Sequence, residues 1–352
     1  MTAGAVTFPH VEIMKVESES AVRDRVRAAI YGTGKIGRAI TAACQESNDV
    51  EVVAAVTTTA DKAGRDLGEI AGTGPLGIVV DDDLGSVLRR DDVDLVFYCG
   101  LGQPAHVAEL LGRIVDAGKD AITLTGLIHP KTALGKDVAG DLERRAKQGG
   151  ARIVGAGWNP GFILDVLPVA FADSCVRIDL ISAQRIAEMR DWGRGVHEEC
   201  GIGRPAEEAQ DSPNNPLHES VALIGDALSL GLDRIANSYE PYLTKKPRQH
   251  GGLRVEPGRI TGFHKRSRGY VGDQVRIEIE MFGIFCIDVE EDRLVEGSSV
   301  RVQGDAEVAC SVTGDWFGDS YPITAFRAVR ASRPLGTLPP GLYRPDQLPL
   351  SG

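Results

Sequence analysis

Three glycines, Gly32, Gly34 and Gly37, stand between a short apolar segment and a segment with helical spacing. In a G-x-G-x-x-G pattern, the first glycine permits a tight turn and the second lets the backbone approach a pyrophosphate. The third lets the helix pack closely on the strand. The N–H groups at the start of such a helix, together with its dipole, favour an anion. The pattern therefore predicts a dinucleotide-binding turn, formed by Gly32, Thr33, Gly34, Lys35, Ile36, Gly37 and Arg38.

The residues about 20 positions after this turn indicate which dinucleotide binds. NAD enzymes usually have Asp or Glu there to bind the ribose 2′-hydroxyl, whereas this chain has Thr57, followed by Thr58 and Thr59. These hydroxyls, with Lys62 and Arg38 nearby, suit a 2′-phosphate. The pattern favours NADP(H), and NAD(H) stays possible because the threonines could simply end a strand.

Three histidine and glutamate side chains could transfer protons. His129 follows a predicted strand, in the kind of loop where parallel sheets bind ligands, and imidazole changes charge near neutral pH. It could equally be an exposed loop residue. His197 and Glu198 precede a glycine-rich segment, where they could face a substrate or form a solvated charged surface.

An Asn-Pro-Gly turn at residues 159–161 is followed by an apolar segment that we interpret as a helix beginning at the turn. Asn159 could then present its amide to a substrate or to the nicotinamide carboxamide, so it is expected at both sites. The alternative is that Asn159 only caps the helix.

Apolar runs at 28–31, 50–56, 93–99 and 121–124 alternate with helical patterns, notably at 106–117. Continuous apolar strands that alternate with helices indicate a Rossmann-type, doubly wound parallel sheet of the α/β class. Ligands bind at the carboxyl ends of such strands. The cofactor is therefore also expected to contact Cys99, Gly100 and Gly126.

The second half of the chain has a different pattern, which predicts a second α+β domain with a mixed or antiparallel sheet. Its expected strands are residues 176–183, 275–281, 300–302 and 306–312, and its expected helices are residues 218–236 and 322–329. The proline-rich tail has too little periodicity to predict an element. The expected divisions are an extension (1–25), the dinucleotide-binding domain (26–155), the substrate domain (156–312) and a C-terminal helix with its tail (313–352), which packs back on the body.

The composition excludes some partners. A net charge of −11 argues against nucleic acid and anionic membranes, which recruit basic surfaces. The chain has no apolar run long enough to span a bilayer and no leader pattern at its start, so a cytoplasmic protein is expected. Its six cysteines are scattered without a C-x-x-C pair, and neither a metal site nor a disulfide is expected.

Five stretches carry a resemblance to a known family. They are KAGRDLGEIAG (62–72), GWNPGFILDVLP (157–168), ESVALIGDALSLGLDRI (219–235), EPGRITGF (256–263) and PPGLYRPDQLP (339–349). From about residue 26 the chain resembles the 2,4-diaminopentanoate dehydrogenases and native amine dehydrogenases, and its N-terminal half resembles dihydrodipicolinate reductases. The resemblance implies a homodimer and reversible oxidative deamination, with hydride passing between the amine-bearing carbon and the nicotinamide.

The chain departs from this family where proton transfer is expected. Family members have a Cys-Glu-Glu-Leu segment with an acid/base glutamate where this chain has Thr125, Gly126 and Leu127. Trp316 and Tyr321 lie where members often have a histidine. Tyr321 is therefore added to His129, His197, Glu198 and Asn159 as a candidate catalytic residue.

These features predict an NADP(H)-dependent oxidoreductase that acts on a C–N bond of a small molecule, as an amine dehydrogenase or an imine reductase. The missing glutamate favours reduction of a preformed C=N or C=O bond, so a ketone reductase is one alternative. A non-catalytic NADP-binding sensor or partner protein is another. Dihydrodipicolinate reduction is disfavoured, because the paired histidines and the Lys and Pro-Ser-Gly-Thr substrate segment are absent.

Overall fold

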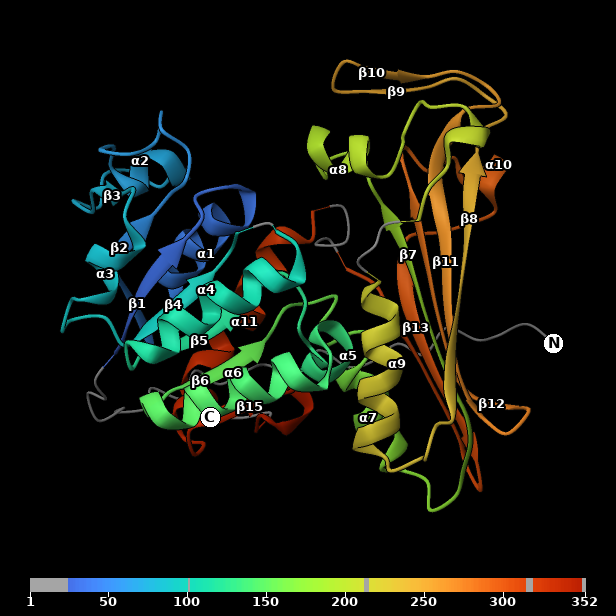
Figure 1. The fold of residues 1–352 in the computed structure, drawn as a ribbon. Helices are drawn as coiled ribbons and strands as arrows, with labels where there is room; N and C mark the ends of the chain where they lie inside the picture. Colours follow the sequence, from blue (N-terminus) through green and yellow to red (C-terminus); the bar gives the residue numbers. More distant parts are fainter. Residues whose placement is uncertain (1–24, 101, 212–214, 315–318, 350–352) are drawn as a thin grey trace, which may run out of the picture.

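The computed structural model describes residues 25–100, 102–211, 215–314 and 319–349. These residues build two sheets, a parallel one on the left of Figure 1 and a mixed one on the right, with the helices α5, α7 and α9 between them. The first 24 residues, which include nearly all of the predicted extension, lie outside the described part.

The first sheet is entirely parallel, with the strand order β15-β6-β5-β4-β1-β2-β3. Apart from β15, this is the order of a doubly wound dinucleotide-binding fold, whose ligand site lies where the winding reverses between β1 and β4. The prediction of a Rossmann-type α/β fold is confirmed. Its strands are β1 (Val26–Tyr31), β2 (Val50–Val56), β3 (Val80–Asp81), β4 (Leu95–Tyr98), β5 (Asp120–Thr123), β6 (Arg152–Gly155) and β15 (Gly341–Tyr343).

Helices cover both faces of this sheet, which explains why its strands are apolar on both sides. One face packs against α1 and α11, and the other against α3, α4 and α6, in two separate apolar cores. The helices around this sheet are α1 (Lys35–Glu46), α2 (Leu67–Ala71), α3 (Leu84–Leu88), α4 (Pro104–Asp116), α5 (Pro130–Leu134), α6 (Lys136–Gly149) and α11 (Tyr321–Gly336).

The second sheet is mixed, as predicted, with the order β14-β13-β7-β12-β11-β8. β7 and β12 run parallel and the other neighbours run antiparallel. Two helices, α7 (Val166–Ala172) and α9 (Pro216–Ala227), pack against one face around an apolar core. The strands are β7 (Ile178–Glu188), β8 (Arg234–Leu243), β11 (Ile260–Val271), β12 (Gln274–Ile284), β13 (Gly297–Gly304) and β14 (Glu307–Val312).

Short elements complete the second domain. A two-stranded ribbon projects beside α8 at the upper edge of this sheet (Figure 1). The remaining elements are β9 (Arg248–His250), β10 (Leu253–Val255), α8 (Arg194–Glu199), α10 (Val289–Asp292) and the 3-10 turns η1 (Ala206–Glu208) and η3 (Pro345–Gln347).

Three sequence predictions about elements are wrong. The helix expected at 218–236 ends at Ala227, and β8 begins at Arg234. Leu228 and Leu232 pack on the same core from the loop, and Ile235 packs on it from β8, so their spacing of four and three residues imitates a helix. The tail does form elements, because β15 pairs with β6 through backbone bonds that need no side-chain pattern. The helix after the Asn-Pro-Gly turn begins only at Val166.

Candidate functional site

The glycine turn between β1 and α1 has the geometry that a pyrophosphate requires. Gly32 has a φ of +97°, and a Cβ there would lie 3.0 Å from the Cys99 carbonyl carbon. A Cβ on Gly37 would lie 1.9 Å from the Gly32 oxygen, so helix and strand pack without space for a side chain. Gly34 faces open space and caps α1 without any side-chain hydrogen bond. These residues fit a dinucleotide phosphate at the helix N-terminus.

Hydroxyl groups connect this turn to the end of β2. The Thr33 hydroxyl donates to the Thr57 hydroxyl at 3.1 Å, and the Thr59 N–H donates to the same oxygen at 3.2 Å. The Lys62 ammonium donates to the Thr33 carbonyl oxygen at 3.1 Å, which holds a positive charge beside the turn. The other two predicted residues of this group, Thr58 and Arg38, are exposed.

A cavity of about 380 Å³ lies between the two sheets, beside the carboxyl ends of β4 and β5. Ile36 of the glycine turn lines it, as do Cys99 and Thr125. Burial raises the pKa of the Cys99 thiol, so the thiol stays protonated at neutral pH. Of the predicted catalytic residues, Asn159 and Tyr321 also line this cavity.

Asn159 lies in the turn that precedes α7. Its Nδ2 donates to the Met281 sulfur at 3.6 Å, and its Oδ1 is buried without a partner among the described residues. Asp165, not Asn159, caps α7, because its carboxylate accepts the Val166 N–H. The geometry therefore leaves an amide oxygen available to a ligand.

Tyr321 stands at the start of α11, where the two domains meet. Its hydroxyl donates to the Trp192 carbonyl at 3.2 Å, and burial raises its pKa. The Lys35 ammonium lies 5.5 Å from the Tyr321 ring centre and donates to the Asp191 carbonyl at 2.6 Å. The first turn of α1 is thereby fastened to the second domain. Trp316, the other residue singled out in this region, lies outside the described residues.

His129 is not among the residues that line this cavity. Its ring is buried, its backbone N–H donates to a Glu219 oxygen at 3.0 Å, and its Nε2 lies 3.0 Å from an Asp226 oxygen. His129 follows β5, as predicted. Its side chain, however, contacts Asp226 of α9 and does not face the cavity. The exposed-loop alternative is also incorrect, since the residue is only 6% exposed.

Glu219, on α9, contacts the segment after β5 that contains Gly126 and His129. It lines an adjoining hollow together with Gly126, and a Cβ on Gly126 would lie 3.3 Å from the Glu219 Oε1. Burial raises the pKa of this carboxyl to about 7, against the opposing effect of the backbone N–H groups that it accepts.

The side chains of the polar cluster on α8 do not point where the sequence predicted. His197 is buried, with Nε2 2.7 Å from the Met189 carbonyl oxygen, and Glu198 forms an exposed ion pair with Arg194 at 2.6 Å. Neither lines the cavity, whereas Glu199 does. Successive helical residues point about 100° apart, so only knowledge of the helix orientation could have separated these neighbours.

Arg185, Met281 and Lys265 line the cavity from the middle of a row of side chains across the mixed sheet. Ser298, Arg185, Met281, Lys265 and Tyr239 are register partners on β13, β7, β12, β11 and β8. Directly paired residues point to the same face of a sheet. The charged residues Arg185 and Lys265 of this row were missed, although in β7 Arg185 falls in phase with the buried Ile181, Ala183 and Ala187.

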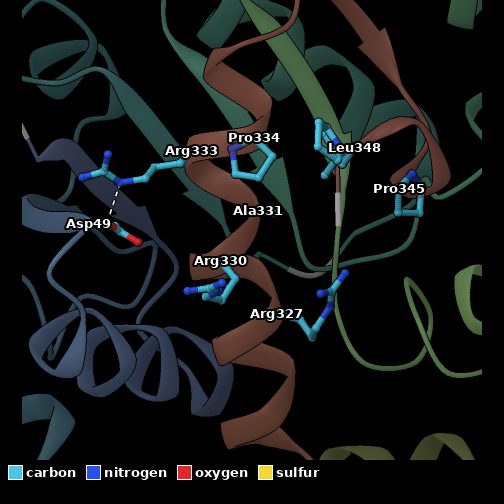
Figure 2. Close-up of a pocket in the computed structure, with 9 residues that line it drawn as sticks. Asp49, Arg327, Arg330, Ala331, Arg333, Pro334, Pro345 and Leu348 are labelled. Carbon is cyan, nitrogen blue, oxygen red and sulfur yellow. Dashed lines mark ion pairs between the residues drawn. The ribbon is translucent and has the colours of Figure 1, made fainter. Parts of the chain in front are cut away.

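A separate small hollow lies along α11, where Arg327, Arg330 and Arg333 fan out from the helix (Figure 2). Arg333 is paired with Asp49 at 2.5 Å. The other lining residues, Ala331, Pro334, Pro345, Leu348 and Pro349, include none of the residues predicted for catalysis or cofactor binding. In the described ranges, no helix is long and apolar enough to cross a membrane, and no cluster of three or more acidic, histidine or cysteine side chains could hold a metal.

Comparisons with known proteins agree with this architecture. Residues 162–325 match the family model of the 2,4-diaminopentanoate dehydrogenase C-terminal domain, and residues 26–139 match that of the dihydrodipicolinate reductase N-terminus. The 2,4-diaminopentanoate dehydrogenase of Acetoanaerobium sticklandii is 26% identical over 275 residues, which cover 73% of this chain and 75% of the relative. An amine dehydrogenase of Streptomyces virginiae is 24% identical over 222 residues, 60% of this chain and 61% of that protein.

Among solved structures, the amine dehydrogenase from Mycobacterium smegmatis has the same fold. Its TM-score is 0.82 at 21% identity, and the match covers 93% of this chain and 97% of that one. The agreement therefore extends over both sheets.

Proposed function

We propose that the chain is a member of the 2,4-diaminopentanoate dehydrogenase and amine dehydrogenase family, to which both of its halves are similar, and that it is an NADP(H)-dependent oxidoreductase that acts on a C–N bond of a small amine or imine. One observation carries the proposal. The cavity between the sheets is lined at once by Ile36 of the glycine turn, by Thr125 after β5 and by Asn159 of the second domain. A dinucleotide held at the turn would reach a substrate held by the second sheet.

The cofactor's phosphates would be held by the N–H groups after Gly34, and its 2′-phosphate by Thr58, Thr59 and Lys62. No carboxylate stands at residues 57–59 to repel that phosphate. The bound nicotinamide would supply hydride exchange at its C4. Every other requirement falls on the chain, which must orient the substrate carbon, exclude water and move protons.

We assign proton transfer to Glu199, which lines the same cavity as Thr125. A carboxylate at this wall would take over from the family glutamate, exchanging a proton with the substrate nitrogen and with the attacking water. The Tyr321 hydroxyl is a second donor on the same cavity. The Asn159 Oδ1 would accept an N–H of the substrate and so direct the nitrogen toward these groups.

The other variant of this function is the reduction of a preformed imine or a ketone, which would not depend on a carboxylate in place of the one missing at residues 125–127. That reaction needs one protonation and no activation of ammonia. With a ketone as the substrate, omitting ammonia separates a ketone reductase, which keeps its turnover, from an amine dehydrogenase, which loses it. An imine reductase is identified by turnover of a preformed cyclic imine and none of ketone with ammonia.

Purified protein tested with NADPH and NADH against amines, imines, and ketones with and without ammonia decides between catalysis and sensing. We expect turnover, with a kcat/KM for NADPH at least about tenfold above that for NADH. A tenfold preference for NADH would refute the NADP(H) assignment. Cofactor binding without turnover across the panel would instead identify a sensor.

A further inference from the structure

The hollow that Glu219 lines has a volume of about 420 Å³ and adjoins the cavity between the sheets. We call it the side hollow. It is bounded by the start of α4, by α5 and by the first turn of α9. Three residues line both the side hollow and the cavity, namely Leu124, Thr125 and Pro216. The two spaces therefore share a wall.

Glu219 gives the side hollow its charge. Among the described residues that line the hollow there is no second carboxylate and no lysine or arginine. The Glu219 carboxylate accepts the backbone N–H groups of Leu127, Ile128 and His129, the last at 3.0 Å. These groups hold the carboxylate in place but carry no net charge. A carboxylate has about four acceptor positions, so one more donor can bind to it.

The glycine at position 126 leaves the Glu219 carboxylate open to the side hollow. A Cβ on Gly126 would lie 3.3 Å from the Glu219 Oε1, which is tighter than most contacts of a Cβ. The backbone φ of +93° also disfavours any residue with a side chain there. The hydroxyls of Thr125 and Thr132, which line the same hollow, are further acceptors.

These groups suit a small cation that donates hydrogen bonds. Glu219 would repel a phosphate or a second carboxylate, and the described lining has no cation that would bind one. A small cation would instead balance the charge of the carboxylate and donate to the remaining acceptor positions. Gly102 and Asn237, at the edge of the hollow, are exposed, so an ion can enter from solvent.

We propose that the side hollow binds an ammonium ion and supplies ammonia through the wall at Thr125 to a substrate in the neighbouring cavity. The proposal rests on the proposed function, because ammonia is a reactant only if the protein aminates a carbonyl compound. It adds to that function a second site, separate from the substrate and the cofactor.

Glu219 converts the bound ion into the nucleophile. One N–H bond of ammonium breaks, the proton binds to a Glu219 oxygen, and the ammonia keeps the electron pair. Burial raises the pKa of Glu219 to about 7, so this carboxylate takes up the proton more readily than an ordinary glutamate does. The ammonia passes Thr125 and its electron pair forms the C–N bond to the carbonyl carbon. The carboxylic acid then returns its proton to solvent.

The kinetics of reductive amination with a ketone, NADPH and varied ammonium chloride test the proposal. Glu219→Gln is expected to raise the KM for ammonium at least about tenfold and to leave the KM for the ketone within about threefold. Ala133→Leu, which narrows the hollow and keeps the carboxylate, should also raise the KM for ammonium. Glu109→Gln, an exposed residue of α4 outside the hollow, is the matched control and should retain the wild-type value. A loss of kcat in Glu219→Gln with an unchanged KM for ammonium would overturn the proposal.

Potassium tests the site without a substitution. K⁺ is similar in size to ammonium but has no proton to give, so potassium chloride should compete with ammonium and raise its apparent KM in the wild type. Tetramethylammonium chloride at the same ionic strength should not, because its cation is too large for the hollow. A purely structural role of Glu219 would give no difference between the two salts.

Melting temperatures without substrate separate this proposal from the proposed function. At pH 8, ammonium chloride is expected to raise the melting temperature of the wild type about 2 °C or more above its value in tetramethylammonium chloride, and to leave that of Glu219→Gln unchanged. If no substrate turns over but this stabilisation occurs, the cation site stands and the oxidoreductase assignment fails. If ketones are aminated while Glu219→Gln and Ala133→Leu keep the wild-type KM for ammonium, ammonia enters the cavity by another route and the proposal is wrong. Equal melting temperatures in the two salts would also overturn it.

Discussion

At the scale of single residues, the acid/base group has a different origin from the one that the family pattern implies. The family resemblance puts the glutamate in the segment that here reads Thr125, Gly126 and Leu127, and Glu199 lines the same cavity as Thr125 from α8 of the other domain. Such an exchange preserves the chemistry if the carboxylate reaches the same substrate nitrogen, whichever wall carries it.

Replacing this carboxylate should therefore act mainly on turnover. Glu199→Gln is expected to lower kcat by about 10²-fold or more, with a smaller effect on KM, because the amide keeps the shape but cannot exchange a proton. Glu198→Gln is the matched control and should change kcat less than about threefold. Steady-state kinetics of both variants check this. Equal losses in the two variants would rule out a specific role for Glu199.

His129 should behave as a structural residue. Since its backbone and ring bond to Glu219 and Asp226, His129→Asn is expected to leave kcat within about threefold of wild type and to lower the free energy of unfolding by about 1–2 kcal/mol. Chemical denaturation and kinetics on the same preparation check both parts. A hundredfold loss of kcat without loss of stability would restore His129 as the proton donor.

At this scale, the sequence predicted the site that backbone atoms form. It did not predict the sites that depend on the direction in which a side chain points. The glycines predicted their turn because Gly32 and Gly37 leave no room for a Cβ and Gly34 keeps the space at the start of α1 open. Glu198 and Glu199 look equivalent in sequence, and only the packing of α8 distinguishes them. Arg185 could have been found, because its position in β7 follows the inward period of the strand.

At the scale of elements, the glycine turn can be tested apart from the stability of the fold. Gly34 has open space where a Cβ would point, and this space is assigned to the pyrophosphate. Gly34→Ala should therefore reduce NADPH affinity at least about tenfold while changing the melting temperature by no more than a few degrees. Gly140→Ala, equally open but on α6, should keep wild-type affinity. Unchanged NADPH affinity in Gly34→Ala would contradict the phosphate assignment.

The contact between α9 and the loop after β5 should make stability depend on pH. Burial raises the pKa of Glu219 in the folded protein from 4.5 to about 7, so the native state binds more protons than the unfolded state between these values. This contribution is complete below pH 4.5 and disappears as the pH rises through 7, a loss of up to about 3 kcal/mol.

Glu219→Gln should remove this part of the slope. Denaturant unfolding at intervals from pH 4.5 to 8 is expected to give a flatter profile for Glu219→Gln than for wild type. Asp165, whose pKa burial raises to about 6, should leave a residual slope in the variant. Parallel profiles for the two proteins would show that folding does not raise the pKa of Glu219.

The ends of helices and strands could be predicted where the apolar residues follow one clear spacing and residues that end the element come directly after them. The strands β1, β2 and β4 are continuous apolar runs and agree with their predictions. The region after Ala227 failed because loop leucines reach the same core at helical intervals. β15 could not be predicted from its own residues, because its extended conformation depends on backbone pairing with β6.

At the scale of the whole molecule, the two sheets have separate tasks that meet in one cavity. The parallel sheet presents the glycine turn and the ends of β4 and β5. The mixed sheet presents the row that contains Arg185, Met281 and Lys265. Alternation of strands and helices was enough to predict both folds, whereas their mutual placement depends on contacts such as Lys35 with Asp191, which no local pattern encodes. The homodimer and the domain limits given above stay predictions.

The central claim is that a cofactor on the first sheet reduces a carbon held against the second. Its most direct measurement is the transfer of deuterium from C4-deuterated NADPH into the product, followed by mass spectrometry. We predict one deuterium on the carbon that bears the nitrogen of the amine product, formed from a preformed imine or from a ketone and ammonia. Oxidation of the cofactor with no deuterium in any product, or binding of NADPH with no oxidation across amines, imines and ketones, would contradict the account.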